Sequence, residues 1–155
     1  MSSDIQGEEL KVVDISAKKV SSRFASAECY VKTNNKVIEL IKAKDIFKGD
    51  VFVVAQTAGI LAAKNVALLI PLCHPILLTY VNVSISIAGC DSIYVKSEVA
   101  SEGKTGPDVE AMHAVSTAAI TIFDMCKAYD KEIVIEKILL LEKKGGKSGE
   151  FKRNC

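Results

Sequence analysis

Apolar and polar residues alternate most regularly over residues 77–88, and this period of two predicts a half-buried strand. Residues 89–91 form a turn that leads into a returning strand over 92–100. Runs of apolar and aromatic residues predict two further strands, over 23–32 and 133–141. The pattern therefore contains two central paired strands and one strand toward each end of the chain.

Helical spacing of apolar residues separates these strands. It predicts helices over 36–45, from the N-cap Asp50 to about residue 65, and from about 107 to 128. The order of elements is then β-α-α-β-β-α-β. This is the split βαβ, ferredoxin-like α+β pattern with an antiparallel sheet and one helix added before the second strand.

The helix that follows Asp50 is apolar on nearly every side. One side carries Val51, Val54, Ala55, Ala58 and Leu61, and apolar residues also cover much of the other side. A helix without a polar face is buried on both sides. In so short a chain this predicts that a second subunit covers it, with close approach at its small residues Ala55, Ala58, Gly59, Ala62 and Ala63.

The composition is that of one globular domain. The chain has 155 residues, of which 49% are hydrophobic and 25% charged, and its net charge of +1 gives no overall basic field for nucleic acid. No apolar run approaches the ~20 residues that cross a bilayer. We expect a flexible leader over 1–10, unlike a signal peptide, and a single domain over 11–155.

Five cysteines and two histidines bear on the cellular compartment and on metals. No two cysteines have the C-x-x-C spacing, and the histidines are too few for a zinc cluster. We therefore expect reduced, mostly buried thiols in a cytoplasmic protein, and no metal.

The helix from 107 to 128 carries the most informative polar residues. Glu110 and Asp124 share a face of small residues, as a pocket wall or an interface would, and Lys127 lies within reach of Asp124. The simpler alternatives are that Asp108 and Glu110 stabilise the helix start and that Asp124 and Lys127 form a surface ion pair. Because 14 residues span about 21 Å along a helix, Glu110 and Asp124 would serve different ends of a site, or sites completed by different subunits.

A second candidate is the segment Leu72-Cys73-His74-Pro75, between the buried helix and the alternating strand. His74 could donate or accept a proton, or bind an anion; the alternative is a loop histidine satisfied by the backbone. A Cys-His nucleophile is disfavoured, because neighbouring residues in an extended segment point to opposite sides.

The glycine- and lysine-rich stretch 142–149 resembles a phosphate loop only superficially. Leu141 stands where the Walker pattern needs glycine, and too few residues follow to form a helix. A mobile basic segment over 143–155 that covers a phosphorylated ligand remains open, as does a solvated tail.

Several segments together resemble the cyclic pyranopterin monophosphate synthase family, the C protein of molybdenum cofactor biosynthesis. The resemblance runs from about residue 13 to 152. Its markers are Lys48-Gly49-Asp50-Val51, Ala58-Gly59-Ile60, Ala62-Ala63-Lys64, residues 69–75, Lys104-Thr105-Gly106, Asp124-Met125-Cys126-Lys127-Ala128 and Lys144-Gly145-Gly146-Lys147-Ser148-Gly149.

The resemblance implies a ferredoxin-like subunit in a homohexamer, arranged as a trimer of dimers with sites at the dimer interface. It implies a lyase that rearranges 3′,8-cyclo-7,8-dihydro-GTP, the product of a radical S-adenosylmethionine enzyme, to cyclic pyranopterin monophosphate with release of pyrophosphate. Such a rearrangement needs several proton transfers and cations near the triphosphate. No cofactor is implied.

The resemblance also implies roles for residues. Asp124 corresponds to the family's catalytic acid or base, with Lys127 and Lys48 beside it. Substrate contacts are implied for Leu72, Cys73, His74, Asp108, Val109 and Glu110, and phosphate contacts for Lys143 and Lys147.

The chain departs from the family at four positions of note. Gln56 and Asn65 replace usual arginines, Leu68 replaces aspartate and Asp108 replaces the longer glutamate. These changes leave open a non-catalytic nucleotide-binding paralogue. An RNA-binding ferredoxin-like module is disfavoured, because the alternating strand offers only Tyr80 for stacking.

Overall fold

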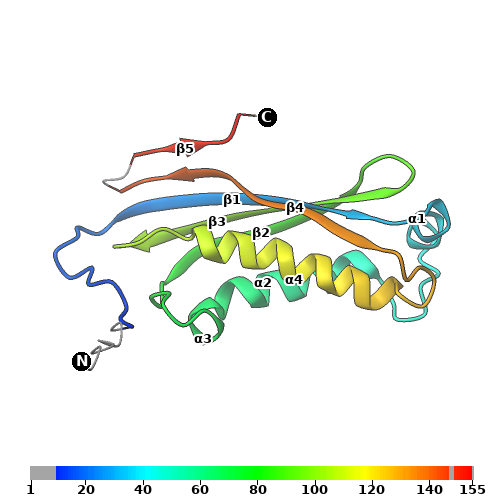
Figure 1. Cartoon of the computed structure of the whole chain (residues 1–155), viewed down its shortest axis with the longest axis horizontal. Coiled ribbons are helices and arrows are strands. Elements are labelled where there is room, and N and C mark those ends of the chain that lie inside the picture. The colour runs from blue at the N-terminus through cyan, green and yellow to red at the C-terminus, as the bar shows by residue number, and fades with distance from the viewer. Residues whose placement is uncertain (1–9, 147–148, 155) are drawn as a thin grey trace, which may run out of the picture.

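A computed structural model describes residues 10–146 and 149–154 of the chain. Its helices and strands follow the predicted order, with a short helix added after the second helix and a short strand added at the C-terminal end (Figure 1). The elements are β1 (Ser21–Lys32), α1 (Asn35–Lys42), α2 (Val51–Lys64), α3 (Val66–Leu69), β2 (Leu78–Ile87), β3 (Ser92–Gly103), α4 (Asp108–Cys126), β4 (Val134–Lys144) and β5 (Phe151–Lys152).

The strands form one sheet in the order β2-β3-β1-β4-β5, and every neighbouring pair is antiparallel. β3 lies between β1 and β2, and β1 lies between β3 and β4, which is the split arrangement of a ferredoxin-like α+β fold. The predicted fold class is confirmed. The two unpredicted elements, α3 and β5, have four and two residues and are too short to show a hydrophobic period.

The helices α2 and α4 lie on one face of the sheet (Figure 1). Alternate residues of β1 point toward them, and Ala25, Ala27, Cys29 and Val31 are fully buried there. On β3, the buried Ser97 hydroxyl donates a 2.7 Å hydrogen bond to the Ala111 carbonyl of α4. The core therefore lies between the sheet and this helical layer, and the opposite face of the sheet is open.

Close contact between α2 and α4 corrects one expectation. A Cβ atom at Gly59 would lie 2.9 Å from the Ala114 carbonyl oxygen and 3.3 Å from the Ala118 Cβ. Gly59 therefore allows close approach of α4 within the same chain, whereas the sequence suggested close approach of a second subunit. Ala114 belongs to the face of small residues that Glu110 and Asp124 share, for which the sequence suggested a pocket wall or an interface, but it is buried against α2.

The outer side of α2 remains apolar and exposed. Val53, Val54 and Leu61 are each exposed by 43% or more, and Leu68 on α3 is exposed as well. The helical spacing of the sequence groups Val54 and Leu61 with Val51 and Ala55 on one side, but in the structure Val51 and Ala55 are buried whereas Val54 and Leu61 are exposed. That a second copy covers this surface stays a prediction.

Element ends differ from the predictions by a few residues. Asp50 caps α2 as predicted, accepting a hydrogen bond from the Val53 amide. α1 ends at Lys42, because Lys44 has a φ of 57°, outside the helical region. β4 extends to Lys144, three residues beyond its predicted end, so Lys143 lies in a strand.

The four cysteines of the described residues are free, but only Cys29 and Cys126 are buried. Cys73 is half-buried and Cys90 is exposed in the turn before β3. Burial raises the pKa of Cys29 to about 12 and that of Cys126 to about 11, so both are inert thiols at neutral pH.

No helix within the described ranges is long and apolar enough to span a bilayer.

Candidate functional site

The two ends of α4 carry separate groups of candidate residues. Glu110 lies in the first turn and Asp124 in the last, about 21 Å apart along the axis at ~1.5 Å per residue. α2 runs beside α4, with its start near Asp124 and its end near Glu110. The chain therefore presents a cavity at the start of α4 and an ion cluster at its end.

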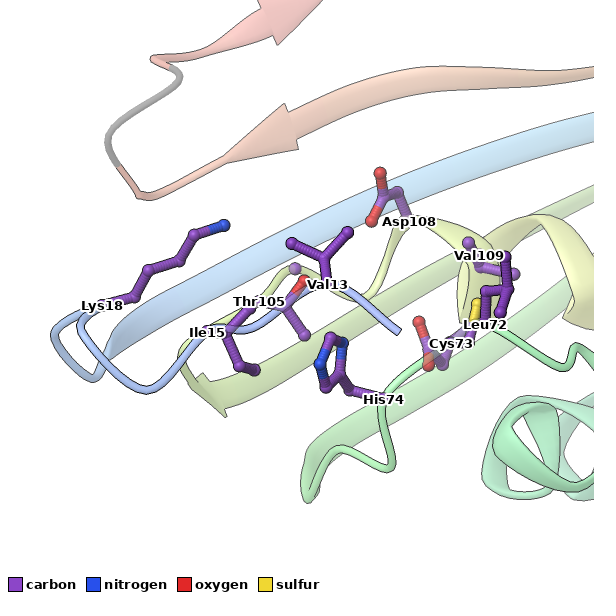
Figure 2. Close-up of a pocket in the computed structure, with 11 residues that line it drawn as sticks. Val13, Ile15, Lys18, Leu72, Cys73, His74, Thr105, Asp108 and Val109 are labelled. Carbon is purple, nitrogen blue, oxygen red and sulfur yellow. The ribbon is translucent and has the colours of Figure 1, made fainter. Parts of the chain in front are cut away.

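The cavity has a volume of about 270 Å³. One wall is the loop that carries Leu72, Cys73 and His74, and another is the start of α4 with Val109 (Figure 2). Glu110, in the same turn of α4, also lines the cavity. With Asp108, which also lines the cavity, the structure brings together six of the predicted substrate contacts. They come from segments more than 30 residues apart in the sequence.

Glu110 is the most deeply buried acid of the cavity, with 4% of its surface exposed. Burial raises its pKa to about 7; a backbone hydrogen bond opposes this rise and the nearby Asp108 charge adds to it. A carboxyl group with this pKa exists in both protonation states near neutral pH. Glu110 can therefore give or take a proton, or bind either a donor or an acceptor on a ligand.

Cys73 and His74 line the same cavity (Figure 2). Neighbouring residues of an extended segment point to opposite sides, yet both residues contribute to the lining; a turn precedes them, in which the Cys73 amide donates a hydrogen bond to the Ile70 carbonyl. The thiol is still a poor nucleophile. Burial, with added repulsion from Glu110 and Asp108, raises the pKa of Cys73 and disfavours its thiolate.

The segment before β1 completes the cavity and was not recognised as part of the site. Val13, Ile15 and Lys18 line it (Figure 2), and the Lys104 ammonium donates a 2.7 Å hydrogen bond to the Ser16 carbonyl. This bond ties the segment to the turn between β3 and α4. The only sequence signal was that the family resemblance begins at about residue 13.

At the other end of α4, Asp124 binds two lysines. Its Oδ1 lies 2.7 Å from Lys127 Nζ, and its Oδ2 lies 2.6 Å from Lys48 Nζ, which also donates to the Asp124 carbonyl. These hydrogen bonds, that from Lys127 first, lower the pKa of Asp124 to about 2. The carboxylate is therefore ionised at any physiological pH, and both ammonium groups keep donors free for a ligand.

The loop before α2 positions Lys48. Ile46 is buried beneath it, and the Phe47 amide donates to the Tyr129 hydroxyl after α4. Gly49 has a φ of 104°, a conformation that favours glycine, and the helix begins directly afterwards. All three residues of the ion cluster remain about half exposed, so it is open to a ligand.

The remaining predicted residues fall outside both groups or beside them. Lys143 lies near the cavity and forms an ion pair with Asp108. Lys147 lies outside the described residues. Within the described ranges no three His, Cys, Asp or Glu side chains gather as metal ligands would.

The family departures at Gln56, Asn65 and Leu68 are not among the residues that line the cavity or form the ion cluster. Gln56 donates a 3.0 Å hydrogen bond to the Val83 carbonyl of β2, and Asn65 donates to the Leu61 carbonyl at the end of α2. Leu68 is exposed on α3. Gln56 and Asn65 therefore have local structural roles, in hydrogen bonds to backbone carbonyls.

The fold and these two groups define a class: a ferredoxin-like α+β protein with a small-molecule cavity and an exposed lysine-aspartate cluster. A family model described as the MoaC family matches residues 12–146. The chain belongs to the MoaC family.

Named relatives agree with this membership. The chain is 49% identical over 142 residues to proteins named cyclic pyranopterin monophosphate synthase from Listeria innocua, Listeria welshimeri and Listeria monocytogenes. In each case the alignment covers 92% of this chain and 89% of the relative.

Proposed function

We propose that the protein is a cyclic pyranopterin monophosphate synthase of molybdenum cofactor biosynthesis. In chemical terms it is a phosphorus-oxygen lyase that converts 3′,8-cyclo-7,8-dihydro-GTP to cyclic pyranopterin monophosphate and pyrophosphate. The observation that carries the proposal is the Lys48–Asp124–Lys127 cluster, which combines a permanently ionised carboxylate with two cations in a chain of this family.

The cluster suits the phosphate end of such a substrate. Closing a cyclic phosphate needs a proton removed from a sugar hydroxyl and negative charge neutralised on the leaving pyrophosphate. We assign proton transfer to Asp124 and one lysine, and charge neutralisation to the other. The low pKa of Asp124 makes it a weak base by itself, so we assign the proton transfer to Asp124 acting together with a neighbouring lysine.

The cavity suits the ring end of the substrate. Leu72 and Val109 offer apolar contact to a planar heterocycle, while His74 and Glu110 offer polar groups that face the same space. Because the pKa of Glu110 is about 7, this carboxyl can match either a ring N–H or a ring nitrogen.

The distance between the two groups argues for a shared site. A nucleotide triphosphate is too short to bridge ~21 Å comfortably within one chain. A twofold axis over the middle of α4 would place the Glu110 end of one copy opposite the Asp124 end of the other. The exposed apolar surface of α2, with Val54 and Leu61, lies on the same helical layer and would be buried by that pairing.

We further propose a homohexamer built as a trimer of such dimers, located in the cytoplasm and requiring no cofactor. Its substrate would come from a radical S-adenosylmethionine enzyme that cyclises GTP. These assignments follow the family resemblance.

The test is to incubate the purified protein with 3′,8-cyclo-7,8-dihydro-GTP and measure pyrophosphate together with the pterin product. We expect equal amounts of both. A folded oligomer that binds the substrate but releases neither product would favour a non-catalytic paralogue and contradict the proposal.

A further inference from the structure

An ion pair joins the start of α4 to the end of β4 beside the cavity. Asp108 Oδ2 lies 2.7 Å from Lys143 Nζ, and the two side chains are only 32% and 29% exposed. We propose that Asp108 is a positioning residue, which holds the Lys143 ammonium at the rim of the cavity so that it binds a phosphate group of the ligand. This inference rests on the proposed function for the identity of the ligand.

The register of β4 directs Lys143 toward the cavity. Lys143 is paired with Ala25 of β1, which is fully buried on the helix-facing side of the sheet. The next residue, Lys144, is paired with Phe24, and its ammonium lies over the Phe24 ring on the open side. The two neighbouring lysines therefore serve opposite faces of the sheet.

Gly106 leaves room for the lysine at this position. A Cβ atom there would lie 3.3 Å from Lys143 Cε and 3.6 Å from Asp108 Oδ1. Gly106 and Asp108 both line the cavity, so the Lys143 side chain crosses its edge to reach its partner. Figure 2 shows the Asp108 carboxylate directed toward the sheet and away from His74.

This direction changes the role of Asp108. A carboxylate that faced a triphosphate would repel it, whereas one that faces a lysine can fix the lysine in place. An ammonium group has three donors, and Asp108 engages one, which leaves two for phosphate oxygens. Holding a long side chain before the ligand arrives also reduces the conformational entropy lost on binding.

Charge and position predict opposite results for Asp108→Asn, and this makes the proposal testable. Removing a negative charge next to a phosphate site should strengthen anion binding if charge alone matters. Losing the anchor of Lys143 should weaken it. Weaker GTP binding by Asp108→Asn would therefore show that Asp108 acts by holding Lys143 in place.

The experiment measures affinity for GTP by calorimetry, as a probe that needs no turnover, and kcat and KM with the cyclised substrate. We expect Asp108→Asn to weaken GTP binding about 3- to 10-fold and to raise KM similarly, with kcat within about twofold. Asp108→Glu should restore most of the affinity. In a Lys143→Met background, Asp108→Asn should have no further weakening effect, because Asp108 acts through Lys143.

Glu142→Gln is the matched control. It removes one carboxylate from a 2.7 Å ion pair with Lys144, but on the open face of the sheet, and should leave GTP affinity unchanged. Unchanged or tighter GTP binding by Asp108→Asn would overturn the proposal, as would an equal loss in the Lys143→Met background or no GTP binding by the wild type. Binding that depends on both residues in a protein without turnover would support the inference while the lyase proposal fails.

Discussion

The two ends of α4 use charge in opposite ways. At its start, Glu110 is buried, has no lysine partner within the described residues, and has a pKa raised to about 7. At its end, Asp124 is half exposed, binds two lysines and has a pKa lowered to about 2. The same helix thus presents a carboxyl poised to change protonation and a carboxylate fixed in its charged form. The difference shows that environment, rather than residue type, decides which chemistry each acid can perform.

Breaking the ion cluster should have the largest effect on turnover. We expect Asp124→Asn to reduce pyrophosphate release about 10³-fold, because it removes the group that holds Lys48 and Lys127 together. Lys127→Ala should have a loss of similar order. Both residues are exposed, so oligomer size and circular dichroism should not change.

Asp91→Asn provides the control for the first prediction. Asp91 is also exposed and paired with a lysine, Lys32 at 3.6 Å, but it lies in the turn before β3. Near-normal turnover in Asp124→Asn would remove Asp124 from the mechanism.

A charge placed on the exposed apolar side of α2 should separate the subunits. Val54→Asp would place a carboxylate in the proposed interface, and we expect about 100-fold or more weaker assembly, seen as a smaller mass by light scattering. Turnover should fall with it, because each site would lose one of its ends. Val134→Asp is the comparison, because Val134 of β4 is 53% exposed against 43% for Val54. An unchanged mass for Val54→Asp would show that this surface is not the interface.

The buried acid should make the stability of the fold depend on pH. Glu110 is protonated in both the folded and the unfolded chain below about pH 4.5, and ionised in both above about pH 7. Because ionisation is disfavoured only in the folded state, its contribution to the free energy of unfolding falls as the pH rises between these values. We compare the free energy of unfolding of Glu110→Gln with that of the wild type, measured by urea unfolding at pH 4 and at pH 8. The difference should shift in favour of the variant by up to about 3 kcal/mol between pH 4 and pH 8. A constant difference across this range would show that Glu110 titrates normally.

The smallest effect on turnover is expected at Gln56, a departure from the family that lies outside the cavity and the ion cluster. Gln56→Ala should cost about 1 kcal/mol of stability through the lost hydrogen bond to the Val83 carbonyl, with unchanged kcat and KM. Chemical unfolding and steady-state kinetics would measure the two quantities. A raised KM would connect Gln56 to substrate binding after all.

Much of the fold could be predicted because it depends on local patterns. The alternation over 77–88 became β2, and the Asp50 cap began α2 at the expected residue. The short elements α3 and β5 could not be predicted, since neither is long enough to show a period. The burial of Ala114 against Gly59 also escaped prediction, because it depends on how α2 and α4 meet, which no single helix encodes.

The sequence could nominate candidate residues for the site but not their geometry. Helical spacing identified Glu110, Asp124 and Lys127, and the family markers pointed to His74 and Lys48. The sequence could not show that Val13 and its neighbours close the cavity, since that contact depends on a lysine bonding to a backbone carbonyl 88 residues away. Nor could it show that Asp108 faces Lys143, which requires the register of β4.

The central claim is that each active site takes its cavity from one subunit and its ion cluster from another. Mixing two inactive variants tests it: His74→Ala, defective in the cavity, and Asp124→Asn, defective in the cluster, are denatured together, refolded and assayed for pyrophosphate release. A twofold pair of unlike subunits would contain one intact site, so a random mixture should recover up to about a quarter of wild-type turnover. No recovery from a mixture shown to contain unlike pairs would place the whole site within one subunit and contradict the account.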